Sequence, residues 1–214
     1  MEQIKLLHAL PTAFHGQTEA ASDVWRREFL FQKGESYLIE AASGTGKTSL
    51  CSFIYGQRND YKGSICFDAK NIRELKVSDW QEIRRLSLSM LFQELRLFPE
   101  LTAWENIELK NRLTSFRKKC EIEGYLEYLD IADKRNVPVG KLSFGQQQRV
   151  AFIRALCQPF DFILLDEPVS HLDESNGAKM AALLQEETAR QGAGVLVTSI
   201  GKHLPLDYSN ILHL

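Results

Sequence analysis

The chain has 214 residues, of which 44% are hydrophobic and 25% are charged, and this composition is typical of one globular domain. Its formal net charge of -2 at pH 7 lacks the basic excess expected of a protein that binds nucleic acid. No C-x-x-C pair occurs, so the sequence predicts reduced thiols and neither a zinc site nor a redox motif at Cys51, Cys66, Cys120 and Cys157.

The first predicted element with a chemical role is a strand at 37–40, "YLIE", which leads into "AASGTGKTSL" at 41–50. A helix over 47–55 is predicted to follow. A strand, a glycine-rich loop and a helix in this order form the context that a phosphate-binding loop requires. Gly44 and Gly46 allow backbone N–H groups to turn toward phosphate oxygens, and the helix N-terminus adds partial positive charge.

Two side chains of this loop carry further chemistry. The Lys47 ammonium offers a point charge to the outer phosphates, and the Thr48 hydroxyl can ligate Mg²⁺. Ala41 stands where the pattern G-x-x-x-x-G-K-[ST] has its first glycine, and because alanine is the smallest substitute we expect nucleotide binding to persist. A glycine-rich helix cap with an exposed lysine is the structural alternative. We expect the nucleotide to be held by Ala41, Ala42, Ser43, Gly44, Thr45, Gly46, Lys47, Thr48 and Ser49.

The stretch from about 100 to 158 contains several helix signals and no convincing strand. A capping box runs from Thr102 to Glu105. The basic run Arg117-Lys118-Lys119 is predicted to lie on a solvated helix face. These signals predict a helical insertion within an α/β core, in which one helix face is formed by Ile122, Tyr125, Leu126 and Leu129.

Two consecutive carboxylates follow a predicted strand at 162–166, "FILLD". Asp166 can hold the coordination shell of Mg²⁺, and Glu167 is placed to polarise an attacking water. An acidic turn after a core strand is the structural alternative. A helix is predicted at 174–191, with Asp173 as its N-cap. Further buried strands are predicted at 65–67, 88–92 and 195–198.

A phosphate loop alone leaves kinases, GTPases, motors and transport ATPases open, and the remaining motifs narrow this choice. The stretches "LSFGQQQRVAFIRAL" at 142–156, "ILLDEP" at 163–168 and "SHLD" at 170–173 resemble the nucleotide-binding domain of ABC ATPases, over nearly the whole chain. The resemblance implies an α/β P-loop NTPase fold with a mostly parallel sheet, an antiparallel N-terminal β region and a helical subdomain. It implies one ATP-binding domain over 1–214, with the core at about 1–93 and 159–214 and the helical subdomain at about 94–158.

The resemblance also assigns roles to single residues. The stretch "LFQELRLFPELTAWENI" is similar to the family's Q-loop segment, which implies that Gln93 contacts the metal and the attacking water. Asp173 would lie near a dimer seam, and Phe14 would stack on adenine. The family's signature would hold the γ-phosphate of an ATP bound by a second subunit, through the helix N-terminus formed by Ser143, Phe144, Gly145 and Gln146.

Three residues depart from the family pattern. Besides Ala41, Phe144 replaces the first central glycine of the signature, while Gly145 is retained. In "VLVTSIGKH", Ser199 occupies the position of the family's switch histidine, and His203 is a candidate substitute. A serine hydroxyl has a shorter reach than an imidazole, so we expect near-normal binding and reduced hydrolysis. The catalytic candidates are Glu167, Gln93 and Ser199, and the metal candidates are Thr48, Gln93 and Asp166.

The resemblance implies an ATP-hydrolysing subunit of an ABC transporter that uses ATP and Mg²⁺ and forms a homodimer on ATP. No apolar run approaches the ~20 residues needed to span a bilayer, so permease subunits on another chain would supply the spans. The protein is then expected in the cytoplasm, at the inner face of the membrane. Two alternatives remain: a degenerate subunit that binds ATP as a switch, and an ABC ATPase of DNA repair or translation. The second would normally carry a coiled-coil insertion, paired cassettes or a basic face.

The segment "RLFPELTAWENI" resembles amino-acid importers and lipoprotein-release, efflux and cell-division subgroups alike, so it does not choose among these subgroups.

Overall fold

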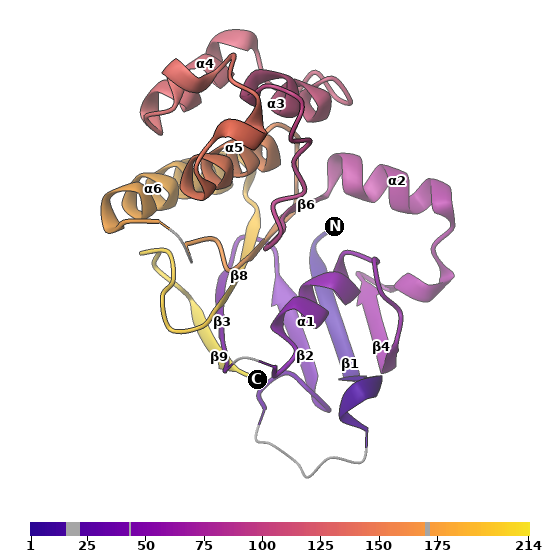
Figure 1. Cartoon of the computed structure of the whole chain (residues 1–214). Helices are drawn as coiled ribbons and strands as arrows, with labels where there is room; N and C mark the ends of the chain where they lie inside the picture. The colour runs from indigo at the N-terminus through magenta and orange to yellow at the C-terminus, as the bar shows by residue number, and fades with distance from the viewer. Residues whose placement is uncertain (16–21, 43, 170–171) are drawn as a thin grey trace.

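Two β-sheets and six α-helices make up the computed structural model (Figure 1), which describes residues 1–15, 22–42, 44–169 and 172–214. The antiparallel sheet has the strand order β2 (Glu28–Gln32), β1 (Gln3–Pro11), β4 (Tyr61–Phe67) and β5 (Lys70–Asn71). The other sheet is parallel throughout, in the order β6 (Leu88–Leu91), β7 (Phe162–Asp166), β8 (Gly194–Ser199), β3 (Ser36–Glu40) and β9 (Asn210–His213). This arrangement confirms the predicted fold class.

The helices cover the parallel sheet on both faces. They are α1 (Lys47–Ile54), α2 (Val77–Leu86), α3 (Ala103–Asn111), α4 (Lys119–Tyr128), α5 (Phe144–Leu156) and α6 (Glu174–Gln191). Figure 1 shows α1 between the two sheets, whereas α3, α4, α5 and α6 gather on the other side of the parallel sheet. None of the helices within the described parts of the chain is long and apolar enough to cross a membrane.

Strand β7 shows why the sequence builds these layers. All five of its residues are buried, as expected for a strand of a parallel sheet that is covered on both faces. Ile163 and Leu165 pack toward α5 and α6, while Leu164 packs toward α1 and the antiparallel sheet. Side chains alternate along a strand, so one apolar run serves two cores. The polar Asp166 comes at the carboxyl end, where the strand leaves the sheet.

The stretch 100–158, all of which is described, contains α3, α4 and α5 and no strand longer than an isolated bridge. The Thr102 capping box begins α3, as predicted. The expectation for Arg117 is wrong: its side chain is buried, and its guanidinium pairs with Glu187 of α6 and donates to the Leu156 carbonyl at 3.2 Å. A charge run in the sequence does not reveal that a distant carboxylate will bury one of its members.

Candidate functional site

The phosphate loop connects the end of β3 to the start of α1, and its glycines are required by its backbone. Gly44 and Gly46 have φ values of +85° and +99°, a region that residues with a side chain rarely adopt. A β-carbon on Gly46 would lie 3.0 Å from the Phe14 ring and 3.2 Å from the Trp25 ring. Ala41, by contrast, has no positive φ, and its N–H donates to the Ser199 carbonyl at 3.3 Å. Alanine therefore fits this position without backbone strain.

The Lys47 ammonium is almost fully buried inside the loop. It donates to the carbonyl oxygens of Ala41 at 3.0 Å and Ala42 at 2.8 Å. Burial lowers the pKa of Lys47, while the nearby Glu167 and Asp166 carboxylates oppose that shift. The loop thus holds a cation opposite two carboxylates.

Asp166 lies at the end of β7 with a side chain that is only partly satisfied. Its Oδ1 accepts a hydrogen bond from the Thr198 hydroxyl at 2.5 Å. Its Oδ2 is buried and accepts none from the described residues. Burial raises the pKa of Asp166, against the opposing effects of the Thr198 and Thr48 hydroxyls and the Lys47 ammonium. An oxygen with unused acceptor capacity at this place suits a hard cation such as Mg²⁺.

A chain of hydrogen bonds joins three of the predicted side chains. The Thr48 hydroxyl donates to Gln93 Oε1 at 3.2 Å, and Gln93 Nε2 donates to Glu167 Oε2 at 3.3 Å. These residues come from α1, from the segment after β6 and from the segment after β7. The parallel sheet brings them together because the carboxyl ends of its strands meet at one edge.

Glu167 has an unusual backbone, with a φ of +50°. A residue with a side chain enters this region at a free-energy cost, and such strain is typical of functional sites. The backbone N–H of Glu167 donates to the carbonyl of Thr198 at 3.2 Å and to its hydroxyl at 3.3 Å. The conformation is therefore fixed from the neighbouring strand β8.

An open pocket of about 360 Å³ lies at the loop, and its lining includes Lys47, Thr48, Gln93 and Glu167. Phe14 lies on its wall, beside Gly46. Two contacts are not predicted by the sequence, because Trp25 and Arg58 lie outside the motif. The Trp25 Nε1–H donates to the Thr45 carbonyl at 3.1 Å, and the Arg58 guanidinium donates to the Ser49 hydroxyl at 3.0 Å. Ser43 lies outside the described residues.

The signature and Asp173 do not line this pocket. The Ser143 hydroxyl accepts from the Gln146 N–H at 3.3 Å, and Gln146 Oε1 accepts from the Ser143 N–H at 3.0 Å. These two bonds form a capping box that encloses Phe144 and Gly145. The Phe144 side chain is 42% exposed. Asp173 caps α6 and accepts from the Asn176 backbone at 2.8 Å.

The Ser199 hydroxyl bonds to the turn that follows it, and Ser199 does not line the pocket. The side chain is buried, and its Oγ donates to the Lys202 carbonyl at 2.6 Å. Ile200, the next residue, lines the pocket. His203 does not: its ring makes an edge contact with Tyr208, with centroids 5.5 Å apart, and a hydrogen bond to the Leu204 carbonyl.

A phosphate loop follows β3 of the parallel sheet, and an acidic pair stands at the carboxyl end of β7, which is separated from β3 by β8. This arrangement defines a P-loop nucleotide-binding protein. The sequence profile of the family described as ABC transporter matches residues 26–170. The chain belongs to the ABC transporter family, as an ATP-binding subunit.

Curated relatives agree with this assignment. The chain is 36% identical over 158 residues to the Fe(3+) ions import ATP-binding protein FbpC of Fusobacterium nucleatum. The aligned region covers 72% of this chain but only 41% of FbpC. It is 33% identical over 174 residues to the uncharacterized ABC transporter ATP-binding protein YclH of Bacillus subtilis, covering 79% of this chain and 75% of YclH.

Solved structures give the same result. The dimeric structure of MJ0796, a bacterial ABC transporter cassette, superposes with a TM-score of 0.78 at 29% identity, covering 92% of this chain and 87% of that one. A post-hydrolysis state of the same cassette, dimeric and bound to ADP and Pi, superposes with a TM-score of 0.74 at 28% identity and the same coverage.

Proposed function

We propose that this chain binds and hydrolyses Mg-ATP and thereby drives permease subunits of an ABC transporter that are carried on another chain. It acts as a single ATP-binding domain over 1–214, with the core at about 1–93 and 159–214 and the helical subdomain at about 94–158. The observation that carries the proposal is the hydrogen-bonded chain from Thr48 through Gln93 to Glu167, set opposite the buried Lys47 ammonium.

Each side chain of this group has a distinct task in hydrolysis. Lys47 places its positive charge beside the outer phosphates, and Glu167 accepts the proton of the water that attacks the γ-phosphorus. Gln93 orients that water, because its amide already bonds the Glu167 carboxylate. Thr48, Gln93 and Asp166 would hold Mg²⁺, whose charge stabilises the phosphate oxygens when it is bound. The wall residue Phe14 is proposed to stack on adenine.

Dimerisation on ATP is the second part of the proposal. The helix N-terminus at Ser143, Phe144, Gly145 and Gln146 has partial positive charge, yet it does not line the pocket of its own subunit. Asp173 likewise stands apart from that pocket. A second copy that presents these residues to the γ-phosphate would complete the site. Both MJ0796 structures are dimers, which supports this reading.

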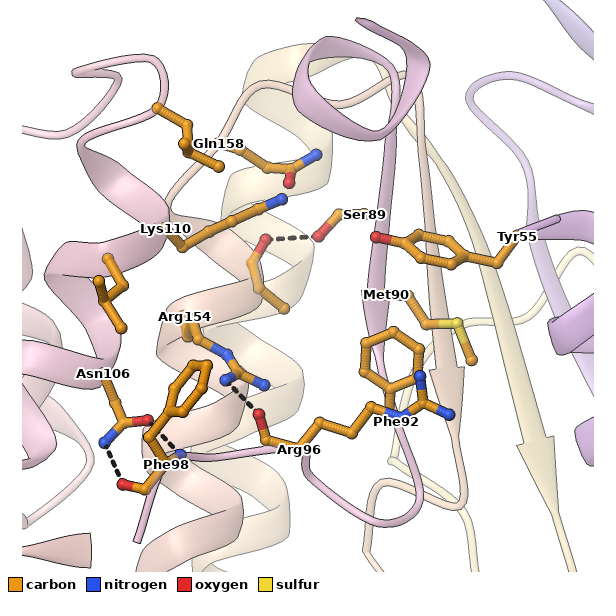
Figure 2. Close-up of a pocket in the computed structure, with 13 residues that line it drawn as sticks. Tyr55, Ser89, Met90, Phe92, Arg96, Phe98, Asn106, Lys110, Arg154 and Gln158 are labelled. Carbon is orange, nitrogen blue, oxygen red and sulfur yellow. Dashed lines mark hydrogen bonds between the residues drawn. The ribbon is translucent and has the colours of Figure 1, made fainter. Parts of the chain in front are cut away.

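A second pocket, of about 240 Å³, supports the proposed contact with a membrane partner (Figure 2). Figure 2 shows Lys110 from α3 and Arg154 from α5 on one side, with Tyr55 and Met90 on the other. Burial lowers the pKa of Lys110 to about 8 and that of Arg154 to about 10. No described carboxylate lines this pocket. It therefore favours an apolar permease segment that carries an acidic side chain, and it would place the protein at the cytoplasmic face of the membrane.

The hydrogen bond of Ser199 favours the alternative of a subunit that binds ATP as a switch with little hydrolysis. The Ser199 hydroxyl is engaged by the Lys202 carbonyl, so it acts on the pocket only through the turn that carries Ile200. This arrangement favours slow hydrolysis in the isolated protein. Phosphate release with Mg-ATP, compared between the wild type and Glu167→Gln, separates the two readings. An active wild type and an inactive variant support hydrolysis, whereas equal rates would support a nucleotide switch.

A further inference from the structure

Gln148 of α5 is a buried side chain to which the activity described above gives no task. Its exposed fraction is 2%, although glutamine is usually found at protein surfaces. Its amide nitrogen lies 2.5 Å from the carbonyl oxygen of Pro168 and 3.5 Å from that of Glu167. A carbonyl only accepts hydrogen bonds, so the amide nitrogen must be the atom that faces Pro168.

The other half of the same amide is unused. Gln148 Oε1 is buried and has no hydrogen-bond partner among the described residues. A buried acceptor without a partner destabilises a fold, and an apolar side chain of the same size would avoid that penalty. Packing alone therefore does not explain a glutamine here. The hydrogen bond that the Gln148 amide donates to the Pro168 carbonyl explains the glutamine.

The bond acts on the strained segment that carries the proposed base. Glu167 has a φ of +50°, and its N–H is held by Thr198 of β8. Gln148, from α5, holds the same segment just beyond Glu167, through the carbonyl of Pro168. Without that second hold, the backbone at Glu167 is free to relax toward negative φ, which would turn its carboxylate away from Gln93.

We propose that Gln148 is a positioning residue that fixes the Glu167 carboxylate for hydrolysis by anchoring the backbone at Pro168. The inference rests on the proposed ATPase function. Because α5 begins at the Ser143 capping box, one helix carries both the proposed γ-phosphate contact for a second subunit and the anchor of this subunit's base.

The test is the variant Gln148→Met, which keeps the length of the side chain and removes its donor. We expect turnover of Mg-ATP to fall about tenfold or more, because a small misplacement of a catalytic group is costly. The Kd of a fluorescent ATP analogue with Mg²⁺ should stay within about twofold, since Gln148 does not line the nucleotide pocket. The matched control is Gln147→Met, whose amide donates to the Leu142 carbonyl at 3.0 Å and should leave turnover unchanged.

A double variant separates positioning from a merely structural role. In a Glu167→Gln background, Gln148→Met should lower the residual rate by less than about twofold, because its effect acts through the missing carboxylate. An equal loss in both backgrounds, a parallel loss of nucleotide binding, or wild-type turnover in Gln148→Met would each overturn the inference and leave the proposed function standing. Failure of both Gln148→Met and Gln148→Leu to fold would also contradict it, since a positioning bond is dispensable for folding. No turnover by the wild type would overturn the proposed function itself, and this inference with it.

Discussion

Gly46→Ala is the perturbation whose magnitude follows most directly from the phosphate loop. At a φ of +99°, the left-handed backbone conformation costs an alanine about 1–2 kcal/mol of conformational free energy. Its β-carbon would also lie 3.0 Å from Phe14 and 3.2 Å from Trp25, so two aromatic rings must move. Overpacking of this kind adds about 1 kcal/mol or more. We expect the free energy of unfolding to fall by about 2–3 kcal/mol.

Denaturant unfolding and titration with a fluorescent ATP analogue measure both consequences. Affinity should also drop, because relief of the strain changes the direction of the loop N–H groups. Gly124→Ala is the control: Gly124 is exposed in α4 with open space around it, and alanine there should raise stability by about 0.5–1 kcal/mol. If Gly46→Ala matched the wild type in stability and affinity, the reasoning about the loop would be refuted.

Three further predictions concern other residues. Arg117→Met should destabilise the fold by about 3 kcal/mol in denaturant unfolding, because it removes the buried guanidinium that pairs with the buried Glu187 carboxylate. The variant Lys119→Met, at an exposed neighbour, should be near neutral. Lys110→Met should raise stability at pH 7. The pKa of Lys110 in the folded protein, about 8, lies below the ordinary value of 10.5, so the charged ammonium destabilises the fold. The wild type should therefore gain stability as the pH rises from about 8 to 10.5, whereas the variant should not. Trp25→Phe removes the indole hydrogen bond to the phosphate loop and should weaken nucleotide binding by about 1 kcal/mol in a titration; unchanged affinity would mean that this bond does not shape the loop.

Local motifs made much of this molecule predictable. The glycine spacing predicts the phosphate loop, and an apolar run that ends in two carboxylates predicts a strand that delivers Asp166 and Glu167 to the sheet edge. The capping boxes at Thr102 and Ser143 are also local, because each joins residues three positions apart. Structure that depends on neighbours in sequence is visible in the sequence.

Contacts between distant segments were not predictable in the same way. Arg117 meets Glu187 across 70 positions of the chain, and Trp25 meets Thr45 across 20. The hold of Gln148 on Pro168 spans 20 positions as well. Nothing in the composition around these residues marks them, because each contact depends on how separate elements of the chain pack against each other. The direction of the Ser199 hydroxyl likewise depends on the turn to Lys202.

Phosphate release shows directly whether this protein hydrolyses ATP. Purified protein is incubated with Mg-ATP beside the Glu167→Gln variant, and nucleotide binding is measured for both. We expect both proteins to bind ATP, and we expect the wild type to release phosphate slowly while the variant releases almost none. Equal release from the two, or binding without any release by the wild type even when a permease is present, would contradict this expectation.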